Sequence, residues 1–153
     1  MKEEPSSKAI RLAAMNLLAR REHSGLELQQ KLSRRFPDAA ENIKSEVDQL
    51  TSEGLQSNIR LAESFIRSRI SRGQGPTKIR FDLKIKGIAD EEIEDAMNEA
   101  EVDWFTLASE VASKKFGFLR GQEIDLQLKG RVSRFLKQRG FSHDHIVSVG
   151  LSS

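Results

Sequence analysis

The sequence repeats one short junction at a fixed offset. The run Lys84-Ile85-Lys86-Gly87-Ile88 recurs 53 positions later, from 84 to 137, as Lys137-Gln138-Arg139-Gly140-Phe141. The same offset carries Ile79 onto Val132, and an earlier block over 28–36 has similar leucines and cations but lacks the glycine. Spacings of this size indicate arrays of helical units, each of which buries its apolar face against a neighbour. The sequence therefore predicts three similar units in series rather than one catalytic domain.

Composition favours small, solvated helical units. The 153 residues are 37% hydrophobic and 31% charged, and they include no Tyr, one Trp and no β-branched run. The absence of cysteine excludes a disulfide framework and a thiolate metal site. No apolar run approaches the length of a membrane span, and the first residues form a polar tail without an apolar signal segment. We therefore expect an all-α, cytoplasmic protein that has no membrane partner.

Capping residues and helix breakers divide the sequence into triplets of helices. The clearest break is 73–77, Gly-Gln-Gly-Pro-Thr, where the proline and threonine are placed to begin a helix. N-caps are predicted at Ser24 with Glu27 in a capping box, at 57–58, at Asp90, at Asp103 and at Ser142 or His143. Helix ends are predicted at Pro37-Asp38, which also starts the next helix, and at Gly54, Gly87 and Gly140.

These boundaries predict a polar tail over 1–7 and three-helix repeats over 8–55, 56–101 and 102–153. In the last repeat, a loop over 117–121 precedes a long helix from about Glu123 to Gly140, which crosses Gly130 at some cost in helix propensity. Three triplets in series without long linkers favour an elongated, arched molecule over a sphere.

Charge is segregated along the chain. Net charge is only +2, yet seven cations between Arg67 and Lys86 face a single acid, Asp82, and the stretch 90–103 holds eight acids and no base. Segregation on this scale indicates a polyanionic or acidic partner for the basic part. The alternative is that two solvated helix faces of opposite sign partly satisfy each other.

Candidates for catalysis or metal binding are thin. His143-Asp144-His145 binds a metal only weakly, because residues two apart on a helix do not face each other. Ser24 beside His23 is explained as a helix cap without invoking nucleophilic catalysis. The run 73–75 resembles part of a phosphate-binding loop, but no strand precedes it and no Gly-Lys-Ser/Thr follows. We therefore expect no enzyme activity, no metal and no cofactor.

Aromatic residues are expected to fill the cores. Phe65, Phe81, Phe116 and Phe135 stand at helical spacing from other apolar residues. Trp104 is either a platform on which bases stack or an anchor for the core of the last repeat.

The helix, turn and short helix of each repeat outline a DNA-reading helix-turn-helix, but the charges contradict that function. The helix after the turn would enter the major groove, and in the second repeat it carries Glu91, Glu92, Glu94 and Asp95. The cations lie instead on the helix before each turn. Such a stripe follows a phosphate backbone without reading sequence, or meets acidic patches on a repetitive partner.

In these same blocks the chain resembles a known family, the RecX regulatory proteins. The blocks Arg21-Glu22-His23-Ser24, Gly75-Pro76 and Lys86-Gly87-Ile88 occur in the family's order. Further similar blocks are Glu27-Leu28, Lys31-Leu32, Gly54-Leu55, Phe65-Ile66, Ile79-Arg80, Asp103-Trp104, Lys114-Lys115-Phe116-Gly117 and Arg134-Phe135-Leu136. The resemblance runs from about Lys8 to Val149.

The resemblance implies a non-enzymatic negative regulator of the RecA recombinase, built of tandem three-helix repeats. Proteins of this family bind the RecA filament on single-stranded DNA and inhibit its ATPase, strand-exchange and coprotease activities. By resemblance, this chain modulates recombinational DNA repair and the SOS response.

A basic surface is the predicted contact with RecA and DNA. Its main members are Arg67, Arg69, Arg72, Lys78, Arg80, Lys84 and Lys86, and further members are Arg34, Arg35, Arg131, Arg134 and Lys137. The partners expected from it are the RecA filament and single-stranded or double-stranded DNA bound through phosphates, and the protein is expected to be a monomer. The alternative function is a stand-alone, sequence-independent nucleic-acid-binding module.

Overall fold

The computed structural model describes residues 6–117 and 125–149, and within these ranges the chain forms helices and no strand. The first triplet is α1 (Ser7–Arg20), α2 (Gly25–Arg35) and α3 (Ala40–Ser52). The second is α4 (Asn58–Ser71), α5 (Pro76–Ile85) and α6 (Asp90–Glu99), and the third is α7 (Trp104–Phe116), α8 (Leu126–Arg139) and α9 (His143–Ser148). The main helix-to-helix packing occurs within each triplet.

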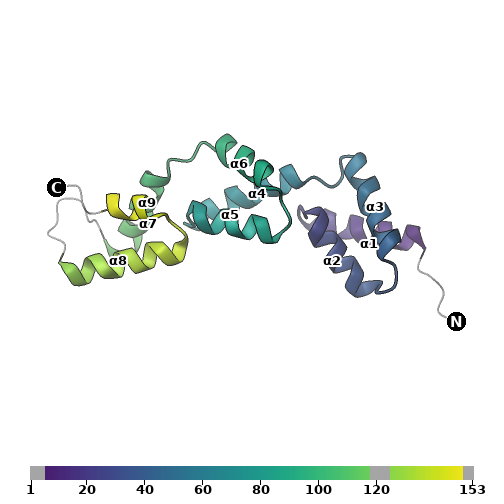
Figure 1. Ribbon diagram of the computed structural model, residues 1–153, viewed down its shortest axis with the longest axis horizontal. Helices are drawn as coiled ribbons and strands as arrows, with labels where there is room; N and C mark the ends of the chain where they lie inside the picture. Colours follow the sequence, from purple (N-terminus) through teal and green to yellow (C-terminus); the bar gives the residue numbers. More distant parts are fainter. Residues whose placement is uncertain (1–5, 118–124, 150–153) are drawn as a thin grey trace.

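The triplets follow one another along the long axis of the molecule (Figure 1). The first lies near the N-terminus at the right of the view, the third lies near the C-terminus at the left, and the middle one is raised between them. The prediction of an all-α, elongated and arched helical repeat is confirmed. No helix in the described ranges has the length and apolar character needed to cross a membrane.

Each triplet buries its own core. The second helix of each contributes two aliphatic side chains four residues apart, which lie on one face of a helix. These pairs are Leu28 and Leu32 in α2, Ile79 and Leu83 in α5, and Val132 and Leu136 in α8, all at most 4% exposed. The three pairs belong to three separate clusters of buried residues. Because burial of one such side chain contributes about 1.5–3 kcal/mol, each triplet has a substantial stabilising core of its own.

The aromatic residues follow the sequence prediction with one exception. Phe65, Phe116 and Phe135 are partly buried against the cores of their units, as predicted. Trp104 packs against both the second and the third core, which favours its role as an anchor over base stacking. The prediction for Phe81 is wrong, because its side chain is 63% exposed.

The exposure of Phe81 follows from the pattern of α5. This helix carries two apolar pairs at a spacing of four residues, Ile79 with Leu83 and Phe81 with Ile85. Residues two apart on a helix point in nearly opposite directions, so only one pair can face the core. The pair Ile79 and Leu83 is buried, which leaves Phe81 and Ile85 in solvent.

Most predicted helix caps are confirmed. Ser24 caps α2 in a capping box with Glu27, and Pro76 is the first residue of α5. Ser57, Asp103 and Ser142 accept the predicted N–H bonds at the starts of α4, α7 and α9. These local signals are reliable because each places a side-chain oxygen beside backbone N–H groups that a helix leaves unpaired.

Two predicted helix starts are displaced. Asp90 is the first residue of α6 rather than its cap; the N-cap is Ala89, whose N–H donates to the Glu92 carboxylate at 3.4 Å. Asp90 still lies where a carboxylate stabilises the positive end of a helix. Pro37-Asp38 forms the turn after α2, and α3 begins only at Ala40.

The third unit is described only in part. Most of the predicted loop over 117–121 and the predicted helix start at Glu123 lie outside the described residues. The described part of α8 begins at Leu126, and the carboxylate of its N-cap Asp125 accepts the Leu128 N–H at 2.7 Å. Gly130 lies within α8, as predicted.

The second helices dock on one another head to tail. Where the first and second units meet, the Ser24 hydroxyl at the start of α2 donates to the Lys86 carbonyl at the end of α5, at 2.6 Å. Where the second and third units meet, the Gly75 N–H at the start of α5 donates to the Arg139 carbonyl at the end of α8, at 2.7 Å. The positive end of one helix therefore meets the negative end of the next.

The repeated glycine permits this close docking. Gly87 and Gly140 have φ of +85° and +93°, in the left-handed region where a residue with a Cβ is strained. A Cβ on Gly87 would lie 2.8 Å from the Leu26 Cβ, and one on Gly140 would overlap the Lys78 Cβ. The end of α2 has no earlier unit to dock on in the described structure, and its C-cap is Phe36 with φ −126°. The glycine of the repeated junction is therefore a docking residue.

Candidate binding surface

The cations of α5 are partly neutralised by carboxylates of the same unit. The pairs are Arg80 with Glu94 at 2.9 Å, Lys84 with Asp90 at 3.6 Å and Lys78 with Asp82 at 3.9 Å. Two of these carboxylates lie on α6, so the acidic stretch of the sequence packs against the basic stretch that precedes it. Such exposed pairs contribute only about 0–1 kcal/mol each, but they reduce the positive potential of this face. The alternative of two faces that partly satisfy each other therefore holds for α5.

Two grooves lie where the units meet. Groove A, between the first and second units, has a volume of about 390 Å³ and is lined by Arg21, Arg69, Arg72 and Lys86, with Glu22 as its one acid. Groove B, between the second and third units, has a volume of about 530 Å³ and is lined by Arg72, Lys114, Lys115 and Arg139, with Glu110 as its one acid. Arg72 lines both grooves, so a row of cations continues from one junction to the other.

Aromatic rings hold several of these cations in place. In groove A the Phe65 ring has the Arg69 guanidinium 4.6 Å and the Lys86 ammonium 5.2 Å from its centre. In groove B the Phe135 ring has Arg139 at 4.9 Å and Lys115 at 5.9 Å. A cation over a ring is stabilised by about 0.5–1 kcal/mol at exposed sites, and the ring itself does not neutralise the charge.

The cations in and beside groove B differ from those of α5 in their pairing. Among the described residues, no ion pair includes Arg69, Arg72, Lys114, Lys115 or Arg139. The Arg139 guanidinium donates to the Arg72 carbonyl at 2.9 Å, which fixes its position across the junction. Guanidinium and ammonium groups that are gathered in a groove and form no ion pair there attract phosphates or carboxylates. The arrangement suits a polyanion.

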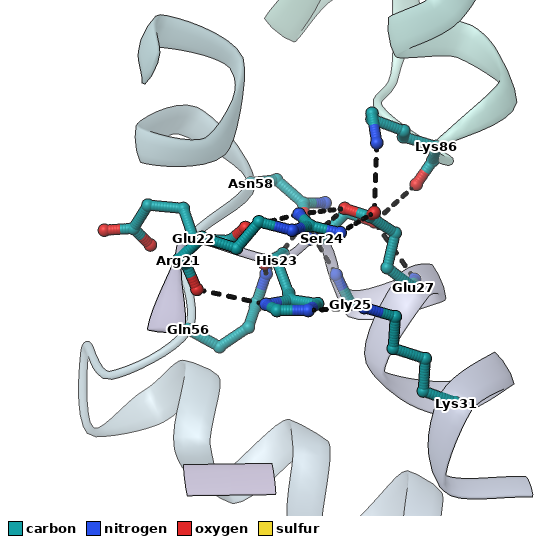
Figure 2. Close-up of polar contacts among 10 residues, drawn as sticks. All are labelled: Arg21, Glu22, His23, Ser24, Gly25, Glu27, Lys31, Gln56, Asn58 and Lys86. Carbon is teal, nitrogen blue, oxygen red and sulfur yellow. Dashed lines mark hydrogen bonds and ion pairs between the residues drawn. The ribbon is translucent and has the colours of Figure 1, made fainter. Parts of the chain in front are cut away.

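At groove A the cations converge on one carboxylate, Glu27 (Figure 2). Glu27 accepts from Arg21 at 2.8 Å, from Lys86 at 3.0 Å and from the Ser24 N–H at 3.1 Å. Burial by itself would raise the pKa of Glu27, but the hydrogen bonds from Arg21, the Ser24 N–H and Lys86 lower it to about 2. Two of the cations that line groove A are therefore paired with a carboxylate outside its lining, whereas no ion pair among the described residues includes a cation of groove B.

The histidine of the first junction is a structural group. His23 is 1% exposed, with Nδ1 3.0 Å from the Arg21 carbonyl and Nε2 2.9 Å from the Lys31 ammonium (Figure 2). Because a carbonyl accepts and an ammonium donates, Nδ1 carries the proton and Nε2 accepts. Burial lowers the pKa of His23, and the nearby cations Arg21 and Lys31 lower it further, against the opposing hydrogen bond to the Arg21 carbonyl. The imidazole is therefore held neutral, and both of its nitrogens bond to groups other than the Ser24 hydroxyl.

Ser24 has no catalytic geometry. Its hydroxyl donates to the Lys86 carbonyl at 2.6 Å and accepts the Glu27 N–H at 3.0 Å. The interpretation of Ser24 as a helix cap is confirmed.

His145, in the last helix, also has a structural role. His145 Nδ1 lies 2.8 Å from the Ser142 hydroxyl in the cap of α9, and its ring packs edge-on against Phe105 at 4.7 Å. No group of three or more His, Asp or Glu side chains in the described ranges is arranged to hold a metal ion.

Comparison with known proteins gives one consistent family. Residues 59–97 match the model of the second three-helix domain of RecX, and residues 101–149 match that of the third. A regulatory protein RecX from Halorhodospira halophila is 43% identical over 97% of this chain and 90% of its own length. One from Pseudomonas putida GB-1 is 46% identical over 90% of this chain and 86% of its own length. The chain belongs to the RecX family.

Solved RecX structures share the fold. The crystal structure of RecX from Lactobacillus salivarius superposes with a TM-score of 0.75 at 23% identity, covering 92% of this chain and 91% of that one. A second crystal structure, of a regulatory protein RecX, gives a TM-score of 0.77 at 21% identity over 96% of this chain and 72% of the other. At this identity the likeness shows that the RecX fold is retained.

The predicted basic residues of this RecX-family chain are distributed over several surfaces. Arg69, Arg72 and Lys86 line the grooves, while Lys78, Arg80 and Lys84 are paired on α5. The outer members line neither groove and are exposed on α2, α4 and α8; they are Arg34, Arg35, Arg67, Arg131, Arg134 and Lys137. The structure therefore does not bring the predicted set together as one patch.

Four groove residues were absent from the predicted set. They are Arg21, Lys114, Lys115 and Arg139. Two signals could have found them: Lys114-Lys115 is an adjacent pair of cations, and Arg139 precedes the repeated glycine. Their convergence depends on how the units dock, which composition and periodicity do not specify.

Proposed function

We propose that this protein is a negative regulator of the RecA recombinase. It binds the RecA filament on single-stranded DNA and inhibits ATP hydrolysis, strand exchange and coprotease activity. In this way it modulates recombinational repair and the SOS response. It acts in the cytoplasm as a monomer made of repeats 8–55, 56–101 and 102–153.

One observation carries the proposal at the level of residues: the row of cations that runs through both grooves and shares Arg72. Membership of the RecX family supports the regulatory role. The elongated shape supports contact with a repetitive partner, because a chain of docked units offers a long surface instead of a pocket. Phosphates of the DNA strand are the proposed ligands of groove B.

The test removes two positive charges from groove B and, in a separate variant, two positive charges from α5, and compares how strongly each variant inhibits RecA. The groove variant is Arg72→Gln with Lys114→Gln, and its matched control is Arg80→Gln with Lys84→Gln, whose cations are already paired with Glu94 and Asp90. The readout is RecA ATP hydrolysis on single-stranded DNA, titrated with wild type and each variant. We expect the groove variant to need at least ten times more protein for half inhibition, and the control less than three times more.

Binding to naked single-stranded DNA supplies the second readout. The slope of log K against log salt is negative, and loss of two phosphate contacts reduces its magnitude by about 1.4, since each contact contributes about 0.7. A groove variant that inhibits as well as wild type would contradict the placement of the surface. Tight, salt-dependent DNA binding by a wild type that has no effect on RecA would instead support a stand-alone nucleic-acid-binding module.

A further inference from the structure

The outer face of α5 carries an apolar pair that its counterparts lack. Phe81 and Ile85 lie one turn apart and are 63% and 62% exposed. The buried pairs of the second helices define which positions correspond: an offset of 53 gives Arg134 and Gln138 in α8, and an offset of 51 gives Gln30 and Arg34 in α2. The same outward face is therefore polar in the first and third units and apolar in the second.

The charges around this pair distinguish it from the grooves. Lys78, Arg80 and Lys84 surround the outer face of α5, and each is paired with a carboxylate of the second unit. None of these cations lines groove A or groove B. A face that combines exposed apolar side chains with neutralised charges is poorly suited to phosphates, whereas apolar anchors with a charged rim are typical of protein interfaces.

The position of α5 links this face to the proposed binding surface. At its start, Lys78 lies against Gly140 of the third unit, and at its end Lys86 bonds to Glu27 of the first. The helix therefore reaches from one junction to the other. Arginine or glutamine at the matched positions of α2 and α8 shows that the fold itself does not require apolar residues there.

We infer that Phe81 and Ile85 are an anchor for the protein component of the filament, and that nucleic acid is contacted elsewhere, in groove B. This inference rests on the proposed function. It assigns one part of the binding surface to protein and another part to nucleic acid. The partner site is an apolar recess on a protein surface that is large enough for two neighbouring side chains. The two side chains enter it as neighbours from one helix face.

The test replaces the anchor with residues that the chain itself uses at these positions. The variant is Phe81→Gln with Ile85→Gln, which copies Gln30 and Gln138. Because glutamine has a higher helix propensity than phenylalanine or isoleucine and the buried pair is untouched, α5 is expected to stay folded. The matched control is Leu12→Gln with Met15→Gln, an exposed apolar pair on α1 at 61% and 40% exposure.

Three measurements follow for each protein: half inhibition of RecA ATP hydrolysis, affinity for naked single-stranded DNA by fluorescence anisotropy, and mass in solution by light scattering. For the α5 variant we expect at least a tenfold rise in the concentration for half inhibition, because two apolar side chains that would be buried in the complex are lost. Affinity for naked single-stranded DNA should change less than twofold. The α1 control and the mass of both variants should match wild type.

Each other outcome overturns the inference. If the α5 variant inhibits RecA as well as wild type, Phe81 and Ile85 are not an anchor for the protein. If the variant loses affinity for naked DNA together with inhibition, Phe81 is instead a residue on which bases stack. A wild-type dimer that the variant dissociates makes the face a contact between copies of this chain. If wild type itself does not inhibit RecA, the proposed function fails first and the inference fails with it.

Discussion

The two junctions between the units use the same docking but different chemistry. At the first, side-chain contacts dominate. The Glu27 carboxylate pairs with Arg21 of its own unit and with Lys86 of the second unit, and the Asn58 side-chain oxygen accepts the Gly25 N–H at 3.0 Å. At the second, backbone dominates, with N–H groups at the start of α5 donating to carbonyls at the end of α8 at 2.7 and 2.9 Å. The first junction therefore depends on charge, whereas the second depends on how closely two backbones approach.

This difference bears on the binding surface. At the first junction Lys86 pairs with Glu27 across the two units, and Arg21 pairs with Glu27 inside the first unit, so fewer unpaired charges remain for a ligand. The second is held by backbone bonds, and no ion pair among the described residues includes a cation of groove B. Docking through glycine and backbone thus leaves groove B available for a polyanion.

The largest expected effect comes from breaking the second junction at Gly140. Gly140→Ala places a Cβ against Lys78 and adds strain at φ +93°, so we expect a loss of about 3 kcal/mol in the free energy of unfolding. Gly54→Ala is the control, because Gly54 has φ +76° but no atom within 4 Å of the added Cβ. It should lose only about 1 kcal/mol from strain.

Urea unfolding followed by circular dichroism measures both variants. The difference between them reports the close approach of the helix ends, since the conformational strain is common to both. Equal losses for Gly140→Ala and Gly54→Ala would show that the second junction tolerates a side chain and that backbone proximity is not what holds it.

The second effect in size comes from the carboxylate of the first junction. Glu27→Gln leaves Arg21 and Lys86 without their counter-charge, and because the Glu27 side chain is only 12% exposed we expect a loss of about 2 kcal/mol at pH 7. Urea unfolding at pH 7 gives this value directly. A loss below about 0.5 kcal/mol would show that the network contributes no more than an ordinary surface pair.

Acid provides an independent check on the same carboxylate. The pKa of Glu27 is lowered from 4.5 to about 2 in the folded protein, so the folded state binds the proton less readily than the unfolded state. The stabilisation is present above about pH 4.5 and is lost as pH falls toward 2. The difference in stability between wild type and Glu27→Gln should therefore shrink over that interval, and a constant difference would contradict the lowered pKa.

Local features of this fold were predictable from the sequence, and long-range ones were not. The caps at Ser24 and Asp103 and the break before Pro76 each depend on interactions within a few residues, so the sequence specifies them directly. The core of α5 was ambiguous, because Ile79 with Leu83 and Phe81 with Ile85 show the same periodicity. Only packing against the neighbouring helices selects between these two faces.

The candidate site was harder to predict than the fold. Segregated charge predicted a basic surface around α4 and α5, but the structure pairs Arg80 and Lys84 with carboxylates of α6. Groove B gathers Arg72, Lys114 and Arg139 from three separate stretches of the chain. Their proximity follows from the docking of α8 on α5, which a comparison of the repeats alone does not reveal.

The smallest expected effect concerns a surface pair that crosses the first junction. Arg60 on α4 meets Glu22 at 3.1 Å, with side chains 45% and 31% exposed. Because solvent screens such pairs, Arg60→Gln should cost less than about 0.5 kcal/mol at low salt, and the cost should disappear at high salt. Arg67→Gln is the matched control, since Arg67 lies on the same helix and forms no ion pair with any described residue. If Arg60→Gln costs as much as Glu27→Gln, the exposed Arg60–Glu22 pair stabilises the first junction as strongly as the largely buried carboxylate of Glu27. Solvent screening would then not explain the difference between the two pairs.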